Sequence, residues 1–565
     1  MSRNSEAANS NGSNCALIYH PHDYSITEKR IMGRRVAGWQ FLRGMIRHGQ
    51  SDTLYCQSES PQHFTEFCSM VSEESQLQKS STWVPPDDPE LLHKIGCLYR
   101  GDPGIGSLAW RRRWGDPRSY SLCGITYTLS SRQVFDSLGD LLVAPLQSWD
   151  AIVCISQSAV NCIRQVLDSY VDYLQRRMAA RPHTPVQLPV IPLGVDCSAF
   201  DPPKDHKKRR KEIRAKWKCE KGEVVVLYAG RLNFHAKANP YPLFVALQEA
   251  QKATGAGVRL VLAGSFPNKE VSNSFRKSWQ MLCPSVSVVL IDGRDEVNWK
   301  DMWQGADVFA SLADNVQETF GLTPVEAMAA GLPVVISDWD GYRETVRHGV
   351  DGFCIPTITP PPGAGLELAR RYAFEQDSYD RFVGHASLCT AVDIDACLEA
   401  FKQLISSAKL RRTMGTAGRQ YARQTFDWKH IIPQYEQLWS ELASRRAADG
   451  ENVPRQVEES PHPLLDDPFS TFRDFPTSRL EDDVILTVGR KALMQQIPHC
   501  PIMNFGGKIL LGPKTCDSIL KKLGESPQAV GDLKKEFSSS SCNLPATLVW
   551  LLKCGVLRIV TDGTH

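Results

Sequence analysis

The sequence predicts an α/β protein with two doubly wound, Rossmann-like domains and a small α+β domain after them. Short apolar strands alternate with helix-length segments, which is the pattern of parallel sheets joined by right-handed crossovers. The pattern starts again with an apolar strand at 224–230, so two sheets are expected. The chain of 565 residues is long enough for about three or four domains. Its hydrophobic content of 42% and charged content of 23% are ordinary for a globular protein.

The expected elements of the first domain begin with a strand at 15–19 and a helix at about 36–48. Later come a strand that runs into a loop, a short buried strand and a long helix, at 121–129, 151–156 and about 158–178. Residues 51–120 show no comparably clear pattern, apart from a turn-rich loop at 85–89. This part of the domain is left without assigned elements.

The second domain opens with the strand at 224–230, and a helix follows at about 241–254. Four more apolar strands are expected, at 259–264, 287–291, 307–310 and 334–337. Ligands of a doubly wound sheet bind beyond the carboxyl ends of its strands. The loops after Gly230 and Gly264, and the loop that contains Glu318, are therefore expected at one edge of this sheet.

The rest of the chain is expected to hold two helices, at 393–409 and 427–446, and then a stretch rich in Pro, Asp, Glu and Ser. The tail is expected to form three short helices and a terminal strand, at 517–523, 529–537, 544–553 and 555–560. That order is typical of a winged helix. Because the tail lacks a concentrated basic stripe, DNA binding is not indicated. A module that packs against another domain or binds a peptide fits the tail at least as well.

These patterns give the following division of the chain. The expected parts are a disordered N-terminus, a first Rossmann-like domain, a second one, a helix that returns to the first domain, a linker and a winged-helix-like domain, at 1–14, 15–200, 201–426, 427–446, 447–480 and 481–565.

The bulk properties exclude several classes of protein. A net charge of +2 does not demand a polyanionic partner, and no nucleic acid is expected. The 17 cysteines include no Cys-x-x-Cys pair, so the spacing of a metal site is absent and reduced thiols are expected. No apolar run approaches the roughly 20 residues that span a bilayer, and residues 1–14 do not resemble a secretory signal. A cytoplasmic location is expected.

A basic run at 204–218 has two interpretations. It carries nine basic and two acidic residues, which fits a solvated helix face. The alternative is peripheral contact with an anionic membrane surface, at the inner face of a membrane, and Trp217 within the run favours that alternative.

The most informative segment is 317–335, which places two carboxylates, Glu318 and Glu326, eight positions apart around the start of a helix. Thr323 is a good N-cap, Pro324 suits the first helical position, and Glu326 follows the cap by three residues. Most such capping boxes do no chemistry. The free N–H groups of a first turn nevertheless attract phosphate, and Glu318 on the preceding loop would then lie near a sugar attached to that phosphate.

Arg231 and Lys237 follow the strand at 224–230. A guanidinium and an ammonium at the carboxyl end of a strand can neutralise a nucleotide diphosphate, in the ground state and in the transition state. The alternative is an ordinary surface basic pair, which would be preferred if Glu318 and Glu326 were missing.

The string from Glu318 to Glu326, with its continuation to residue 335, resembles the E-x7-E signature of retaining glycosyltransferases of family 4. The resemblance covers residues 15–446 and is most specific at 224–356. It implies a GT-B fold, in which two Rossmann-like domains face a cleft. It also implies transfer of a sugar, with retention of configuration, from a nucleotide-diphosphate donor in the second domain to an acceptor on the first, without a metal or other cofactor.

The resemblance also implies roles for individual residues. Glu318, Arg231 and Lys237 match the catalytic positions, although the lysine stands one position later than in many members of the family. The residues that match donor-binding positions are Gly33, Gly230, Gly264, Phe320, Gly321, Leu322, Thr323 and Glu326, the last of which is expected to reach the ribose.

The acceptor side departs from the family pattern. Tyr127 occupies the place where similar proteins often carry a histidine, and a phenol is a poor base. His20 and His22 could supply an imidazole, although ordinary loop histidines are the simpler interpretation. The acceptor is an unknown glycan, lipid or peptide. Two rival functions follow: a catalytically weak relative that acts as a binding or scaffold protein, and a peptide or protein glycosyltransferase that holds its target with the tail.

Overall fold

The computed structural model divides the chain into two compact units, residues 1–462 and residues 463–565. The structure describes residues 14–24, 33–74, 79–86, 88–450, 453, 460, 462–503, 505–507, 509–537 and 543–560. The expected disordered N-terminus falls outside these residues except for Asn14. Among the described residues, none of the helices has the length and apolar character that crossing a membrane requires.

The first domain is built on a six-stranded parallel sheet with the order β3-β2-β1-β4-β5-β6. The strands are β1 (Ala16–Ile18), β2 (Thr53–Gln57), β3 (Ser80–Val84), β4 (Cys97–Tyr99), β5 (Ser121–Ile125) and β6 (Ala151–Val153). The helices are α1 (Pro21–Tyr24), α2 (Gly33–His48), α3 (Pro61–Glu74), α4 (Pro89–Ile95), α5 (Gly106–Gly115), α6 (Arg132–Asp140) and α7 (Gln157–Met178). Three strands (β2, β3 and β4) and three helices (α3, α4 and α5) lie wholly within residues 51–120, where the sequence predicts only a turn-rich loop at 85–89.

The second domain repeats this topology. Its parallel sheet has the order β12-β11-β10-β7-β8-β9, which is the order of the first sheet when its own strands are numbered from one to six. The strands are β7 (Val224–Ala229), β8 (Val258–Ala263), β9 (Ser287–Ile291), β10 (Val308–Ser311), β11 (Val334–Ser337) and β12 (Gly352–Ile355). The prediction of two Rossmann-like domains is therefore confirmed.

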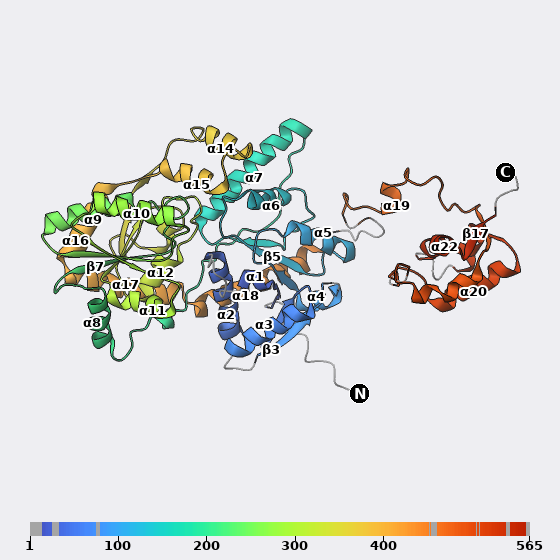
Figure 1. Cartoon of the computed structure of the whole chain (residues 1–565), viewed down its shortest axis with the longest axis horizontal. Helices are drawn as coiled ribbons and strands as arrows, with labels where there is room; N and C mark the ends of the chain where they lie inside the picture. The colour runs from blue at the N-terminus through green and yellow to red at the C-terminus, as the bar shows by residue number, and fades with distance from the viewer. Residues whose placement is uncertain are drawn as a thin grey trace. The chain divides into compact units, whose positions relative to one another are not determined.

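Helices cover both faces of the second sheet. They are α8 (His206–Lys216), α9 (Tyr241–Thr254), α10 (Lys269–Leu282), α11 (Glu296–Gly305), α12 (Leu322–Ala329), α13 (Tyr342–Thr345), α16 (Ile394–Ser406) and α17 (Ala408–Thr425). Figure 1 shows α9, α10 and α16 on one face and α11 and α12 on the other. Successive residues of β7 point to opposite faces, so that Val226 packs in one core cluster and Leu227 in the other. A strand buried on both faces needs apolar residues at every position, which is why these strands read as continuous apolar runs.

The two domains are joined where the chain passes between them twice. Val195 N donates to Phe426 O at 2.7 Å, and Trp428 N donates to Val195 O at 3.4 Å, so the outgoing and returning segments lie side by side. The Trp428 indole fills this junction. A Cβ atom placed on Gly194 would lie 2.3 Å from the Trp428 ring, so only glycine fits there.

The returning helix is α18 (Trp428–Asp449), and it packs on the first domain. Its Tyr435 ring lies 4.9 Å from the Phe41 ring on α2, centroid to centroid. Near its end, Arg446 Nη1 donates to Ser121 Oγ at 2.9 Å. One core cluster contains residues of both sheets and of this helix, so apolar packing connects the two domains.

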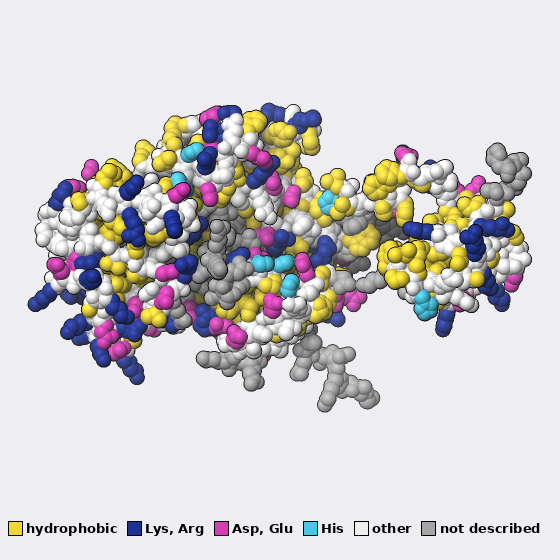
Figure 2. Space-filling view, viewed as in Figure 1, with side chains coloured by type: hydrophobic (Ala, Val, Ile, Leu, Met, Phe, Trp, Pro, Cys, Tyr) yellow, Lys and Arg dark blue, Asp and Glu magenta, His cyan; other side chains and the backbone are white. Residues whose placement is uncertain are grey.

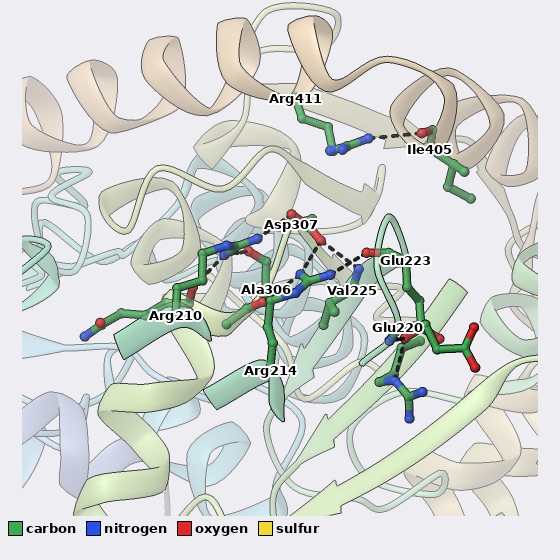
Figure 3. A network of polar contacts seen from close by, with 12 residues as sticks. Arg210, Arg214, Glu220, Glu223, Val225, Ala306, Asp307, Ile405 and Arg411 are labelled. Atoms are coloured by element: carbon green, nitrogen blue, oxygen red, sulfur yellow. Dashed lines mark hydrogen bonds and ion pairs between the residues drawn. The ribbon is translucent and has the colours of Figure 1, made fainter. Parts of the chain in front are cut away.

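The basic run forms α8, and its charged side chains divide into two sets. Arg210 and Arg214 point toward Asp307, just before β10, and donate to its carboxylate at 2.5 and 2.8 Å (Figure 3). The lysines of the helix face solvent, and dark-blue side chains gather at the lower left of Figure 2, where Figure 1 places α8. The arginines therefore fix the helix to the second domain.

Trp217 does not support membrane contact. Its side chain is buried, and a Cβ atom placed on Gly305 would lie 2.2 Å from its ring, so the indole is packed against α11. The interpretation of Trp217 as a membrane-facing residue is wrong, because the ring fills the gap between α8 and α11. Contact through the exposed lysines stays a prediction.

The second unit, residues 463–565, has its own apolar core and a three-stranded antiparallel sheet with the order β16-β15-β17. The elements are α19 (Pro468–Thr471), β15 (Ile485–Val488), α20 (Pro513–Glu525), β16 (Gln528–Ala529), α21 (Val530–Glu536), α22 (Leu544–Lys553) and β17 (Leu557–Ile559). The three helices and terminal strand expected from the sequence correspond to α20, α21, α22 and β17. The winged-helix assignment stays a prediction.

Candidate active site at the edge of the second sheet

The candidate site lies where the order of the second sheet reverses, between β7 and β10. These two strands are adjacent and parallel, and each is followed by a loop that carries charged residues. The loop after β7 contains Arg231 and Lys237, and the loop after β10 contains Glu318. Open α/β sheets bind ligands outside the carboxyl ends of their strands at such a switch point. The fold therefore positions these loops as a ligand site.

Lys237 and Glu318 form an ion pair across the two loops. Their side chains are 19% and 13% exposed, so both charges keep limited access to solvent. The Tyr342 hydroxyl lies 3.0 Å from Ser311 Oγ, and Glu318 is a neighbour of the same ring. Burial and the neighbouring Glu318 charge raise the pKa of Tyr342, which keeps this phenol neutral. Glu318 is thus paired with a cation and lies near a neutral phenol.

Arg231 lies beside this pair and is more open. Its Nη2 donates to Ala236 O and to Gln317 Oε1, both at 3.1 Å. The residue as a whole is exposed, and the Gln317 amide that it contacts precedes Glu318 in the chain. The structure thus brings Arg231, Lys237 and Glu318 together on two adjacent loops.

The helix after Glu318 begins earlier than the sequence predicts. The N-cap of α12 is Gly321, with φ of 91°, and no side chain caps the first turn. The prediction that Thr323 is the N-cap of a capping box is wrong, because Thr323 already lies within the helix. A Cβ atom at residue 321 would lie 2.1 Å from the Tyr342 ring, so this glycine permits both the left-handed turn and the close packing of Tyr342. Within the part of the chain that the structure describes, no side chain accepts a hydrogen bond from the N–H groups of the first turn.

Replacing Gly321 with alanine is expected to destabilise the fold and to displace this helix start. The strained φ contributes about 1–2 kcal/mol and the overlap with Tyr342 a further ~1–3 kcal/mol. Gly331→Ala is the matched control, because Gly331 has a φ of 83° but its added Cβ would lie 3.8 Å from the nearest atom. Chemical denaturation of both variants measures the difference. Equal losses in the two variants would contradict the packing argument.

Glu326 is buried behind the first turn of α12, with 6% of its surface exposed. Burial raises its pKa to about 7, while Lys237 and the nearby Gln40 side chain of α2 act in the opposite direction. Two other carboxyls near the site behave similarly: burial raises the pKa of Asp340 to about 7 and that of Asp314 to about 6. The site therefore holds several carboxyl groups that titrate close to neutral pH.

The raised pKa of Glu326 predicts that the difference in unfolding free energy between the wild type and a Glu326→Gln variant depends on pH. The folded protein keeps the proton of Glu326 up to about pH 7, whereas the unfolded chain loses it near the ordinary glutamate pKa of 4.5. Stability from this group is therefore full below about pH 4.5 and is lost as pH rises through 7. Glu326→Gln, which mimics the protonated form, should match the wild type at about pH 4 and exceed it by about 3 kcal/mol at pH 8. Urea denaturation across this range measures the difference, and a constant difference would contradict it.

The other residues that match donor-binding positions lie in different surroundings. Gly230, with φ of 147°, directly follows β7, and a Cβ atom on Gly264 would lie 1.9 Å from Gly230 O, so these two loops touch through their backbones. Phe320 is 3% exposed and packs on Phe426, so its ring lies in the core and does not face the candidate site. Leu322 is the first residue of α12, and Gly33 is the first residue of α2.

The expected acceptor-side residues lie in the first domain, near the ends of its strands. Tyr127 follows β5, and its carbonyl accepts a hydrogen bond of 2.8 Å from Thr319 Oγ1 of the second domain. The ring lines a small cavity together with Tyr24 and Tyr99. His20 Nε2 lies 3.3 Å from Glu59 Oε1, and His22 lies on the short helix α1. Tyr127 is thus linked to the loop of Glu318, and the cavity that its ring lines also includes Tyr24 of α1, the helix that carries His22.

Sequence reasoning missed several residues of this site. Tyr342 and Asp340 follow β11, and Tyr379 lies on a helix that had no predicted function. Their roles depend on packing between segments far apart in the sequence, so no local pattern marks them. Among the described residues, no group of three or more His, Cys, Asp or Glu side chains is placed to hold a metal ion.

Comparison with known proteins shows a family match in this part of the chain. Residues 209–360, which contain all the charged residues of the candidate site, match the family described as glycosyl transferases group 1. The D-inositol 3-phosphate glycosyltransferase of Jonesia denitrificans is 28% identical over 183 residues, which cover 32% of this chain and 42% of that protein. The alpha-monoglucosyldiacylglycerol synthase of Streptococcus pneumoniae is 27% identical over 190 residues, which cover 34% of this chain and 38% of that protein.

Solved structures give more distant matches. Anabaena HepE in complex with UDP aligns with a TM-score of 0.46 and 15% identity, over 76% of this chain and 100% of that chain. Sucrose-phosphate synthase from Thermosynechococcus elongatus aligns with a TM-score of 0.45 and 17% identity, over 76% of this chain and 99% of that one. The chain spans about two fifths of the length of the two curated relatives named above. The second Rossmann-like domain of this protein thus matches the group 1 glycosyl transferase domain.

Proposed function

We propose that this protein is a retaining glycosyltransferase of the GT-B type, similar to family 4, that takes a sugar from a nucleotide-diphosphate donor. The observation that carries the proposal is the convergence of Arg231, the Lys237–Glu318 pair and the uncapped start of α12 at the switch point of the second sheet. Two cations and a helix N-terminus suit a diphosphate, and a carboxylate suits the hydroxyls of a sugar. The match of residues 209–360 to group 1 glycosyl transferases supports the same conclusion.

In the proposed reaction, the bond between the anomeric carbon and the donor phosphate oxygen breaks, and a bond from that carbon to the acceptor oxygen forms on the same face. Negative charge grows on the leaving diphosphate, where Arg231, Lys237 and the first N–H groups of α12 would stabilise it. A phosphate oxygen of the leaving group takes the proton of the acceptor hydroxyl. Glu318 would hold the sugar hydroxyls, and no metal ion or other cofactor enters this scheme.

Binding of a nucleoside diphosphate is the first test. A ligand specific for the folded state raises the melting temperature by mass action, so a thermal-shift screen of nucleoside diphosphates and their sugars should identify the donor base. Calorimetry with the best ligand should then show weaker binding to Arg231→Ala than to the wild type. Absence of any shift across the panel, or unchanged affinity in the variant, would contradict the proposed donor site.

A peptide acceptor is the second candidate, because the chain carries a separate compact unit at 463–565 whose sheet has strands β16 and β17 at its edges. Edge strands can bind extended peptides through backbone hydrogen bonds. If this unit holds a peptide target, deleting residues 463–565 should abolish transfer to a peptide while donor hydrolysis continues. Equal loss of both activities, or of neither, would remove this candidate.

A further inference from the structure

The second domain contains a two-helix insertion that the proposed reaction does not yet use. It consists of α14 (Leu366–Ala373) and α15 (Tyr379–Leu388), and it lies between β13 (Thr357–Ile358) and β14 (Ala391–Val392), which pair antiparallel. We call residues 359–390 the α14–α15 hairpin.

The hairpin is held together by its own side chains. Arg371 donates to both oxygens of Asp377, at 2.8 and 2.9 Å, and His385 Nδ1 lies 3.2 Å from the same carboxylate. The rings of Tyr372 and Phe382 stack at 4.5 Å. These contacts join α14 to α15, so the hairpin can act as a single support.

The α15 helix contacts the loop that leads to Glu318. Asn315 in this loop is fully buried, and its Nδ2 donates to Val383 O of α15 at 3.3 Å and to His235 O at 2.6 Å. Its Oδ1 accepts a hydrogen bond of 3.0 Å from Gln317 N. One amide side chain therefore ties α15 to both loops of the candidate site.

Tyr379, the first residue of α15, extends this network across the domains. Its hydroxyl lies 2.8 Å from Ser130 Oγ of the first domain, and the neighbouring Gln317 side chain acts to lower its pKa. Gln317 Oε1 in turn accepts from Arg231 Nη2 at 3.1 Å. A chain of neighbouring polar groups thus runs from the first domain through Tyr379 and Gln317 to Arg231.

We propose that Tyr379 is a positioning residue. Through Gln317 it holds the Arg231 guanidinium in the orientation that binds the donor. It does so when its hydroxyl contacts Ser130 of the first domain. This inference rests on the proposed function, because it assigns Arg231 to the donor diphosphate. The Gln317 carbonyl accepts a second contact from the first domain, from Thr128 Oγ1 at 3.4 Å. The first domain thus contacts the Gln317 backbone directly, and it reaches the Gln317 side chain through Tyr379. On this proposal, Arg231 becomes aligned in the same step in which the two domains come together.

Tyr379→Phe tests the proposal because it removes the hydroxyl and keeps the ring. Tyr372→Phe is the matched control, since it makes the same change on the same hairpin, in a ring that stacks on Phe382. We expect the dissociation constant of the nucleoside diphosphate to rise about fivefold to tenfold in Tyr379→Phe, which corresponds to ~1–1.4 kcal/mol, and to stay unchanged in Tyr372→Phe. An unchanged constant in Tyr379→Phe would overturn the proposal.

A double-mutant cycle separates positioning from a general loss of structure. In the Arg231→Ala background, Tyr379→Phe should have no further effect on nucleotide affinity, because the group that it positions is gone. If the two effects add in full, Tyr379 does not act through Arg231 and the proposal fails.

Hydrogen exchange of the free protein gives a measurement that does not need a ligand. The backbone amides of residues 315–318 should exchange faster in Tyr379→Phe than in the wild type and in Tyr372→Phe. Unchanged exchange would overturn the support of this loop by Tyr379, whatever the ligand. If instead exchange rises but no nucleotide binds the wild type, the proposed function fails and the support of the loop by Tyr379 remains.

Discussion

Glu318→Gln is expected to lower the rate of sugar transfer by about 10²–10³-fold, while the protein stays folded. The carboxylate lies at the carboxyl edge of the second sheet, and its side chain is 13% exposed beside Lys237 and Tyr342. Glutamine keeps the shape of the side chain but removes the negative charge that strengthens its hydrogen bonds to the sugar hydroxyls. Steady-state transfer assays with saturating donor measure this effect.

A second glutamate provides the control for this substitution. Glu249 on α9 is also paired with a lysine, with 2.7 Å between its Oε1 and Lys252 Nζ, but its side chain is 48% exposed and it lies outside the site loops. Glu249→Gln should leave the transfer rate unchanged. Full turnover by Glu318→Gln would remove Glu318 from the mechanism.

Lys237→Met is expected to have the second largest effect, with a loss of about 10²-fold or more in kcat/KM. Two causes combine. The leaving diphosphate loses a cation, and Glu318 is left partly buried without its counter-charge, which is itself unfavourable. Nucleoside diphosphate affinity should also fall, since the ammonium would contact the diphosphate before and during transfer.

Calorimetry and transfer kinetics on the same sample distinguish these causes. Lys252→Met, which breaks the exposed pair with Glu249, should change neither quantity. If Lys237→Met keeps the kcat/KM of the wild type, the charge of Lys237 is not required for transfer. A loss of thermal stability alone, with normal kinetics at low temperature, would assign Lys237 to the fold.

The sequence was sufficient to predict strands β7 to β11 of the second sheet, but not β12 (Gly352–Ile355). Strands that are buried on both faces must be apolar at successive positions, as in β7, and such runs are visible without a structure. By contrast, β3 (Ser80–Val84) reads Ser-Ser-Thr-Trp-Val and shows only one buried residue, so its sequence carries no such run. Edge strands of this kind take their conformation from the neighbouring strand, and local patterns do not reveal them.

The candidate site likewise contains some residues that the sequence predicts and others that it does not. Arg231, Lys237 and Glu318 were identified because they stand at fixed distances from apolar strands and within a long motif. The start of α12 at Gly321 was missed, because it depends on the Tyr342 ring, which lies 21 positions further along the chain. Tyr379 was missed for the same reason: its partners Ser130 and Gln317 come from distant segments.

The pairing of Val195 with Asp427 has a consequence for turnover. Two covalent links that run side by side serve as one pivot, which permits rotation of the domains and resists their sliding apart. Entry of a bulky donor and exit of its diphosphate would then require the halves to swing about this point. Substitutions at Gly194, where the Trp428 ring leaves no room for a side chain, would stiffen or displace the pivot, and would alter the rate of product release without touching a reacting atom.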